Sequence, residues 1–130
     1  MRFPTRFLGV LLPLLLLSTL LLPSCNKDDD KTFDIYRSWR VVSVSRAGVD
    51  VPDHSAVGDL YDFQKNGRCH ITRKATGRTE EVRWSRDEKE STLYLDDIRY
   101  EVYKTERKAF DFGQLVDGND VGTLHLEPQS

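Results

Sequence analysis

From residue 39 to residue 127, apolar and polar side chains alternate in short segments rich in β-branched and aromatic residues. Turn-forming residues separate these segments, and Asn66-Gly67 is a strong signal for a tight hairpin. A period of two residues places successive side chains on opposite faces of a strand, so each segment is predicted to be a strand with one buried face. The predicted strands cover residues 39–46, 59–64, 68–73, 78–85, 91–95, 98–105, 109–115 and 121–127.

The connections between these segments are mostly tight turns, which join antiparallel neighbours. A long meander of twisted strands removes its exposed edges by closing on itself. We therefore predict an all-β fold, in which an eight-stranded antiparallel up-and-down meander closes into a small barrel. Residues 51–58 are predicted to form a loop, and Thr32 is expected to cap one helical turn over residues 33–37.

Large aromatic side chains occupy many of the positions predicted to face inward. They could line a ligand cavity or fill a solid core. An eight-stranded barrel is only just wide enough for its side chains or one small ligand, so we favour the filled core. We expect the two tryptophans to plug one end of the barrel. The candidate ligand-lining or core residues are Trp39, Tyr61, Phe63, Trp84, Tyr100, Phe110 and Phe112.

The first 24 residues have the pattern of an export signal. Arg2 and Arg6 make a positive start, and residues 7–22 are almost continuously apolar. This apolar run is shorter than the roughly 20 residues that a membrane-spanning helix needs, and it contains Pro13. We therefore expect residues 1–24 to be a signal peptide that is removed.

The apolar run ends in Leu22-Pro23-Ser24-Cys25, which resembles a lipobox, the recognition motif of the lipoprotein signal peptidase. Leu22 supplies the aliphatic residue of that motif, and Ser24 supplies the small residue before the cysteine. Pro23 is a less usual middle residue. The resemblance implies cleavage before Cys25 and lipid attachment to its thiolate, which anchors the chain stably when two or more acyl chains are present.

Residues 25–32 form an acidic, flexible tether in this interpretation. The run Asp28-Asp29-Asp30 cannot pack into a core and resembles the acidic export signal of Bacteroides-group lipoproteins. That resemblance implies the outer membrane, with the protein facing the cell surface rather than the periplasm. A generic polar linker is the alternative.

Residues 33–130 make up the predicted barrel domain, and residues 33–127 of it resemble the lipocalin-like domains of small Bacteroides-group lipoproteins. The resemblance is carried by Ile35-Tyr36-Arg37-Ser38-Trp39, by the segment from Leu60 to Gly67 and by Gly122-Thr123-Leu124-His125-Leu126. The family usually has a glycine and a small residue before the tryptophan, where this chain has Arg37-Ser38. The resemblance implies a fold more than an activity.

Charge and composition exclude several classes of function. Removing the first 24 of 130 residues leaves 106, enough for one domain, and takes the formal charge from −2 to −4 because only Arg2 and Arg6 are lost. A mildly acidic domain is not expected to bind nucleic acid. The basic residues Arg73, Lys74 and Arg78 are interrupted by turn residues, and we interpret them as a solvated hairpin tip.

Neither the histidines nor the cysteines form a recognisable catalytic or metal-binding motif. His54, His70 and His125 lack the spacing of a metal site, and we expect them to be exposed. Cys69 lies on the predicted inward face with Ile71 and is predicted to be a small core residue. With no nucleophile elbow or phosphate-binding loop in the chain, we predict a protein that is not an enzyme and needs no metal or cofactor.

Two functions remain as expectations. The first is a membrane-anchored binding module that takes a small apolar ligand or a protein partner. The second is a structural or accessory subunit of an outer-membrane assembly, with a filled barrel and no ligand. A cavity lined by Trp84, Tyr100 and Phe112 would favour the first, whereas a solid interior with an exposed apolar patch would favour the second.

Overall fold

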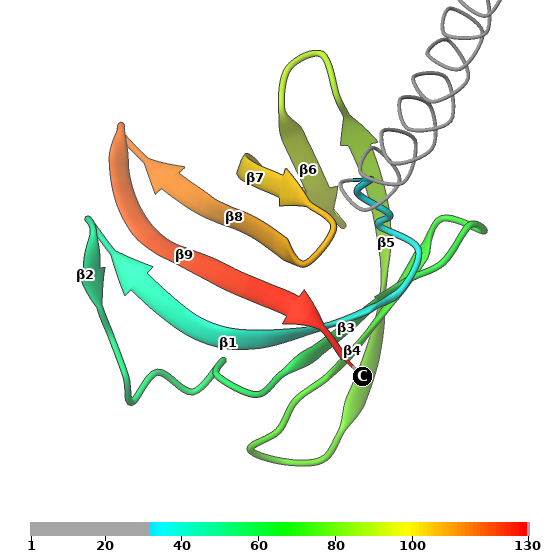
Figure 1. Cartoon of the computed structure of the whole chain (residues 1–130), viewed down its shortest axis with the longest axis horizontal. Helices are drawn as coiled ribbons and strands as arrows, with labels where there is room; N and C mark the ends of the chain where they lie inside the picture. The colour runs from blue at the N-terminus through cyan, green and yellow to red at the C-terminus, as the bar shows by residue number, and fades with distance from the viewer. Residues whose placement is uncertain (1–31, 130) are drawn as a thin grey trace, which may run out of the picture. The chain divides into compact units, whose positions relative to one another are not determined.

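The computed structural model describes residues 32–129, which form nine strands and no helix (Figure 1). Every strand pairs antiparallel with its neighbours in the order β2-β1-β3-β4-β5-β6-β7-β8-β9, and β1 also pairs with β9. This last pairing closes eight strands into a barrel and confirms the predicted all-β meander. The strands are β1 (Ser38–Arg46), β2 (Val49–Asp50), β3 (Leu60–Phe63), β4 (Arg68–Thr72), β5 (Thr79–Asp87), β6 (Thr92–Leu95), β7 (Ile98–Glu106), β8 (Ala109–Val116) and β9 (Asn119–Pro128).

The short strand β2 is an addition that the sequence pattern did not predict. Ala47 and Gly48 both have positive φ, which turns the chain back so that β2 pairs with the end of β1. The same two-residue turn recurs at Asp117-Gly118, where both φ angles are positive, between β8 and β9. Such turns match the right-handed twist of the strands that they join.

A β-bulge in β1 sets which side chains enter the barrel. The register with β9 shifts between Val41 and Ser43, so strict alternation is broken at this point. Val41 and Val44 are consequently both buried, although they are three residues apart. The bulge adds an apolar residue to the interior and bends β1 around it.

Two expectations from the sequence are wrong, one about the segment before β1 and one about the inward face of β7. No helical turn forms at residues 33–37, because the Asp34 carboxylate accepts the Tyr36 amide and the Ile35 carbonyl accepts the Arg37 amide. In the alternating pattern of the sequence, Ile98 shares one face of its strand with Tyr100 and Val102, which predicts that Ile98 points inward, but 46 % of its surface is exposed. It begins β7 directly after the turn at Asp96, beyond the end of the core.

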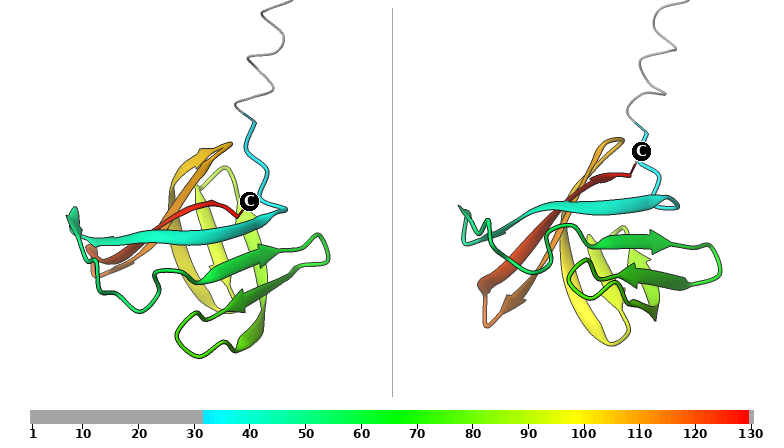
Figure 2. Two further views of the ribbon diagram at one scale, coloured as in Figure 1. Left: turned by 60° about the horizontal axis from the view of Figure 1, so that its bottom comes forward. Right: turned by 90° about the horizontal axis from the view of Figure 1, so that it is seen from below.

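The barrel domain has two distinct ends. The chain enters at one end, where residues 33–37 lead into β1. The tips of the β1–β2 and β8–β9 hairpins lie at the other end (Figures 1 and 2). No helix within residues 32–129 is long and apolar enough to cross a membrane.

Candidate functional site

The interior of the barrel is occupied by aromatic rings that touch one another. Phe110 and Phe112 lie at the centre, with their ring centroids 5.1 Å apart. Phe110 contacts Trp39 at 5.5 Å and Phe63 at 6.0 Å. Contacts of 4.5–7 Å in tilted or edge-to-face geometry are favourable beyond the area that they bury. All seven candidate rings belong to this one network, namely Trp39, Tyr61, Phe63, Trp84, Tyr100, Phe110 and Phe112.

Trp39 closes the barrel at the end where the chain enters. Its side chain is fully buried, and its Nε1 donates a hydrogen bond of 3.2 Å to the Ile35 carbonyl. The ring of Phe33 packs over it at 5.6 Å. The segment before β1 therefore covers Trp39 through a bend at residues 36–37, whereas the sequence had predicted a helical turn in this place.

A buried carboxylate holds a second region of the barrel together. Asp59, whose side chain is only 2 % exposed, accepts hydrogen bonds from the Lys74 amide at 2.9 Å and from Arg73 Nη1 at 3.0 Å. Arg73 also pairs with Glu80 at 3.2 Å. Burial raises the pKa of the neighbouring Tyr61 hydroxyl to about 12, and Arg73 opposes this shift. No local motif in the sequence marks Asp59, because its partners Arg73 and Lys74 lie 14 and 15 positions later in the chain.

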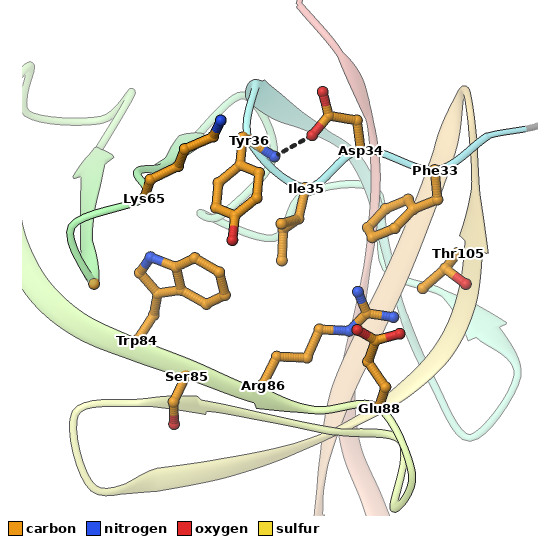
Figure 3. Close-up of a pocket in the computed structure, with 11 residues that line it drawn as sticks. Phe33, Asp34, Ile35, Tyr36, Lys65, Trp84, Ser85, Arg86, Glu88 and Thr105 are labelled. Atoms are coloured by element: carbon orange, nitrogen blue, oxygen red, sulfur yellow. Dashed lines mark hydrogen bonds between the residues drawn. The ribbon is translucent and has the colours of Figure 1, made fainter.

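A hollow lies outside the ring network, at the end where the chain enters (Figure 3). Its volume is about 640 Å³, it is open on one side, and most of its lining is polar. Four parts of the chain form it: the segment before β1, the β3–β4 turn, the second half of β5 with the turn that follows it, and β7. The residues that carry its chemistry are Phe33, Asp34, Tyr36, Lys65, Trp84, Ser85, Arg86, Glu88 and Thr105.

Trp84 separates this hollow from a smaller one of about 400 Å³. Gly67, Trp84 and Ser85 line both. The indole is half-buried, and its Nε1 donates a hydrogen bond of 2.9 Å to the Gln64 carbonyl. Trp84 therefore packs against the ring network and also lines both hollows. The hollows do not extend into the ring network.

Apolar side chains are exposed at the opposite end of the barrel. Val49 of β2, Leu115 and Val116 of β8 and Val121 of β9 are each at least 40 % exposed. The two hairpins that carry them are tied together, because Asp120 accepts the amide of Ala47 at 2.8 Å. We call Val49, Leu115, Val116 and Val121 the hairpin-tip residues.

Three polar residues form a hydrogen-bonded chain across β1, β9 and β8. His125 Nε2 lies 2.9 Å from Ser45 Oγ, and His125 Nδ1 lies 3.1 Å from Asp111 Oδ2. His125 and Asp111 are directly opposite each other in the ladder between β8 and β9. This connectivity is that of a serine, histidine and acid relay, although no spacing in the sequence connects these three residues.

The other two histidines are also engaged. His70 Nε2 lies 2.9 Å from Glu81 on β5, and His54 Nδ1 accepts the Ala56 amide at 3.0 Å. Residues 32–129 contain no group of three or more histidine, cysteine, aspartate or glutamate side chains that could hold a metal ion. Cys69 is fully buried, and burial raises the pKa of its thiol to about 12, which keeps it protonated.

The predicted lipidation and export residues lie outside the described residues. These are Leu22, Pro23, Ser24, Cys25, Asp28, Asp29 and Asp30. No protein-family model matches the sequence, and no match to a curated protein was found.

Proposed function

We propose that this chain is an exported lipoprotein, held to the outer membrane through lipid on Cys25 and facing the cell surface. Its barrel serves as a non-enzymatic module that docks a protein partner. The observation that carries this proposal is the packed interior, in which each of the seven candidate rings contacts at least one other. A carrier of a small apolar ligand needs room inside the barrel, and here Trp84, Tyr100 and Phe112 belong to the packed network instead.

The hairpin-tip residues support a docking surface at the end away from the chain entry. Exposed apolar side chains that gather in one place mark interaction sites more often than scattered ones do. The contact between Ala47 and Asp120 fixes the two hairpins against each other, so that little flexibility is lost on binding. With lipid attached before the entry end, the hairpin tips are free to meet a partner.

Site-specific photo-crosslinking in intact cells tests this proposal. A benzophenone amino acid is introduced at Val49 or at Val121 in the full chain. As matched controls, the same amino acid is introduced at Arg78 and at Glu90, which are exposed turn residues elsewhere on the barrel. We expect a discrete crosslinked product from both tip positions and none from the controls. Absence of a product from Val49 and Val121, or equal products from all four positions, would contradict the docking function.

A further inference from the structure

Two polar hollows adjoin Trp84, and the docking function leaves both of them unused. Gly67, Trp84 and Ser85 line both hollows. We call the two together the Trp84 groove. The groove lies at the end where the chain enters, whereas the hairpin-tip residues lie at the other end (Figures 1 and 3).

Trp84 is a rigid platform within this groove. Its Nε1 is bonded to the Gln64 carbonyl, and its ring meets Phe63 edge-to-face at 5.3 Å. Tyr36 approaches it from the segment before β1, with ring centroids 5.9 Å apart. Because three parts of the chain hold the indole, it is already ordered before a ligand arrives, which reduces the entropic cost of binding.

Charges of both signs line the groove. The larger hollow has Lys65, Arg86, Asp34 and Glu88 (Figure 3), and the smaller one adds Arg68, Arg83 and Asp96. The carboxylates oppose a phosphate or another strongly anionic ligand, and the cations oppose a strongly cationic one. An apolar ligand would remove water from these charged side chains without replacing their hydrogen bonds, which is unfavourable.

We propose that the Trp84 groove binds a neutral oligosaccharide. Sugar hydroxyls donate to carboxylates such as Glu88 and accept from cations such as Lys65, so both signs of charge are used. The C–H bonds on one face of a sugar ring carry a partial positive charge and are attracted to the negative face of an aromatic ring. Trp84 lines both hollows and is only half-buried, so part of its ring is open to such a contact.

Titration of the full-length, lipid-anchored protein tests this proposal. The protein is extracted in a polyoxyethylene detergent, because glycosidic detergents would compete for the site. The probes are malto-, cello-, xylo- and mannohexaose, with a hyaluronan hexasaccharide as the anionic probe and anilinonaphthalene sulfonate as the apolar one. We expect at least one neutral hexasaccharide to bind, measured by calorimetry and by a change in tryptophan fluorescence, and the hyaluronan fragment to bind more weakly.

Two pairs of substitutions locate the binding. Glu88→Gln and Lys65→Ala should each weaken binding of the neutral sugar by about tenfold or more, since each removes a charge-assisted hydrogen bond. Their controls Glu90→Gln and Lys89→Ala change exposed residues of the adjacent turn and should leave the affinity unchanged. Trp84→Ala should also weaken binding. If that variant does not fold, Trp84→Phe, which keeps an aromatic ring in place, should still bind more weakly than the wild type.

Several outcomes would overturn the proposal. They are the absence of binding by all four neutral hexasaccharides, preference for hyaluronan or the apolar dye, and unchanged affinity in Glu88→Gln and Lys65→Ala. The docking function is independent of these results, because it rests on residues at the other end of the barrel. Val121→Ser should accordingly bind the sugar as the wild type does.

Discussion

Asp111 and His125 lie directly opposite each other on β8 and β9, and their side chains meet at 3.1 Å. The other ring nitrogen of His125 lies 2.9 Å from Ser45 Oγ on β1. Side chains thereby link β1, β9 and β8 in addition to the backbone hydrogen bonds of the sheet. The pairing of β1 with β9 is the one that closes the barrel. We interpret this chain of contacts as a cross-strand polar network that supports closure, because cross-strand pairs stabilise sheets.

This interpretation predicts that Ser45 is not a reactive nucleophile. A catalytic serine needs hydrogen-bond donors for the developing oxyanion, and the nearby Ala47 amide is already bonded to Asp120. A fluorophosphonate probe should therefore fail to label the wild-type protein. Asp111→Asn should lower the free energy of unfolding by about 1 kcal/mol or less, as for other partly exposed pairs. Labelling that disappears in Ser45→Ala would instead establish a hydrolytic centre.

A second prediction concerns stability at high pH. Burial raises the pKa of the Cys69 thiol and of the Tyr61 hydroxyl to about 12, from ordinary values of 9.0 and 10.0. The unfolded chain therefore loses these protons first as the pH rises. Stability should be full below about pH 9 and should decline between about pH 9 and 12.

Urea unfolding at several pH values checks this decline, and Cys69→Val should make it shallower. As an independent measurement, Ellman's reagent at pH 8 should leave Cys69 unmodified in the folded domain and modify it after denaturation. Rapid modification under native conditions would show that the thiol is accessible.

Asp59 should be more important for stability than the exposed acid that shares its partner. Asp59→Ala removes the acceptor of both the Lys74 amide and Arg73, and it should cost about 2–3 kcal/mol. Glu80→Ala removes a half-exposed partner of the same arginine and should cost about 1 kcal/mol or less. Chemical denaturation of the two variants compares these costs, and equal losses would show that burial of Asp59 has no special effect.

Much of the fold followed from the two-residue period of the sequence. All eight barrel strands were predicted, because alternation and turn residues act over a few positions and can be read locally. Strand β2 was missed because it is only two residues long, and the bulge in β1 because it depends on the pairing with β9. The inward placement of Ile98 failed because a strand end can extend beyond the core.

The candidate site was less predictable, because its residues come together only in the closed barrel. Trp84 was singled out for its size, but Tyr36 and Lys65 join it from distant positions in the chain. Asp59 and Arg73 likewise meet across the β3–β4 hairpin. No spacing in the sequence marks such groups, since each position is unremarkable in its own segment.

Lipid attachment at Cys25 gives the fourth prediction. In the proposed function, lipid is attached to the thiol of Cys25. Cys25→Ala removes that thiol, so labelling by palmitate should be lost. The same change should move the protein out of the membrane fraction. Cys69→Ala is the matched control and should leave both labelling and fractionation unchanged, because that thiol is buried in the barrel. Palmitate labelling that survives Cys25→Ala would contradict the lipoprotein assignment.

The last prediction compares the two tryptophans. Trp39 is fully buried against Phe33 and Phe110, so Trp39→Ala should cost about 3–5 kcal/mol, a large part of a typical domain stability of about 5–15 kcal/mol. Trp39→Phe keeps an aromatic ring but loses the hydrogen bond to the Ile35 carbonyl, and it should cost less. Trp84→Phe should cost less still, because that indole is half-buried and faces the groove on one side. Thermal and urea unfolding of the three variants give this order. A Trp39→Ala domain that melts near the wild-type temperature would show that Trp39 does not plug the barrel and would make it a candidate ligand contact.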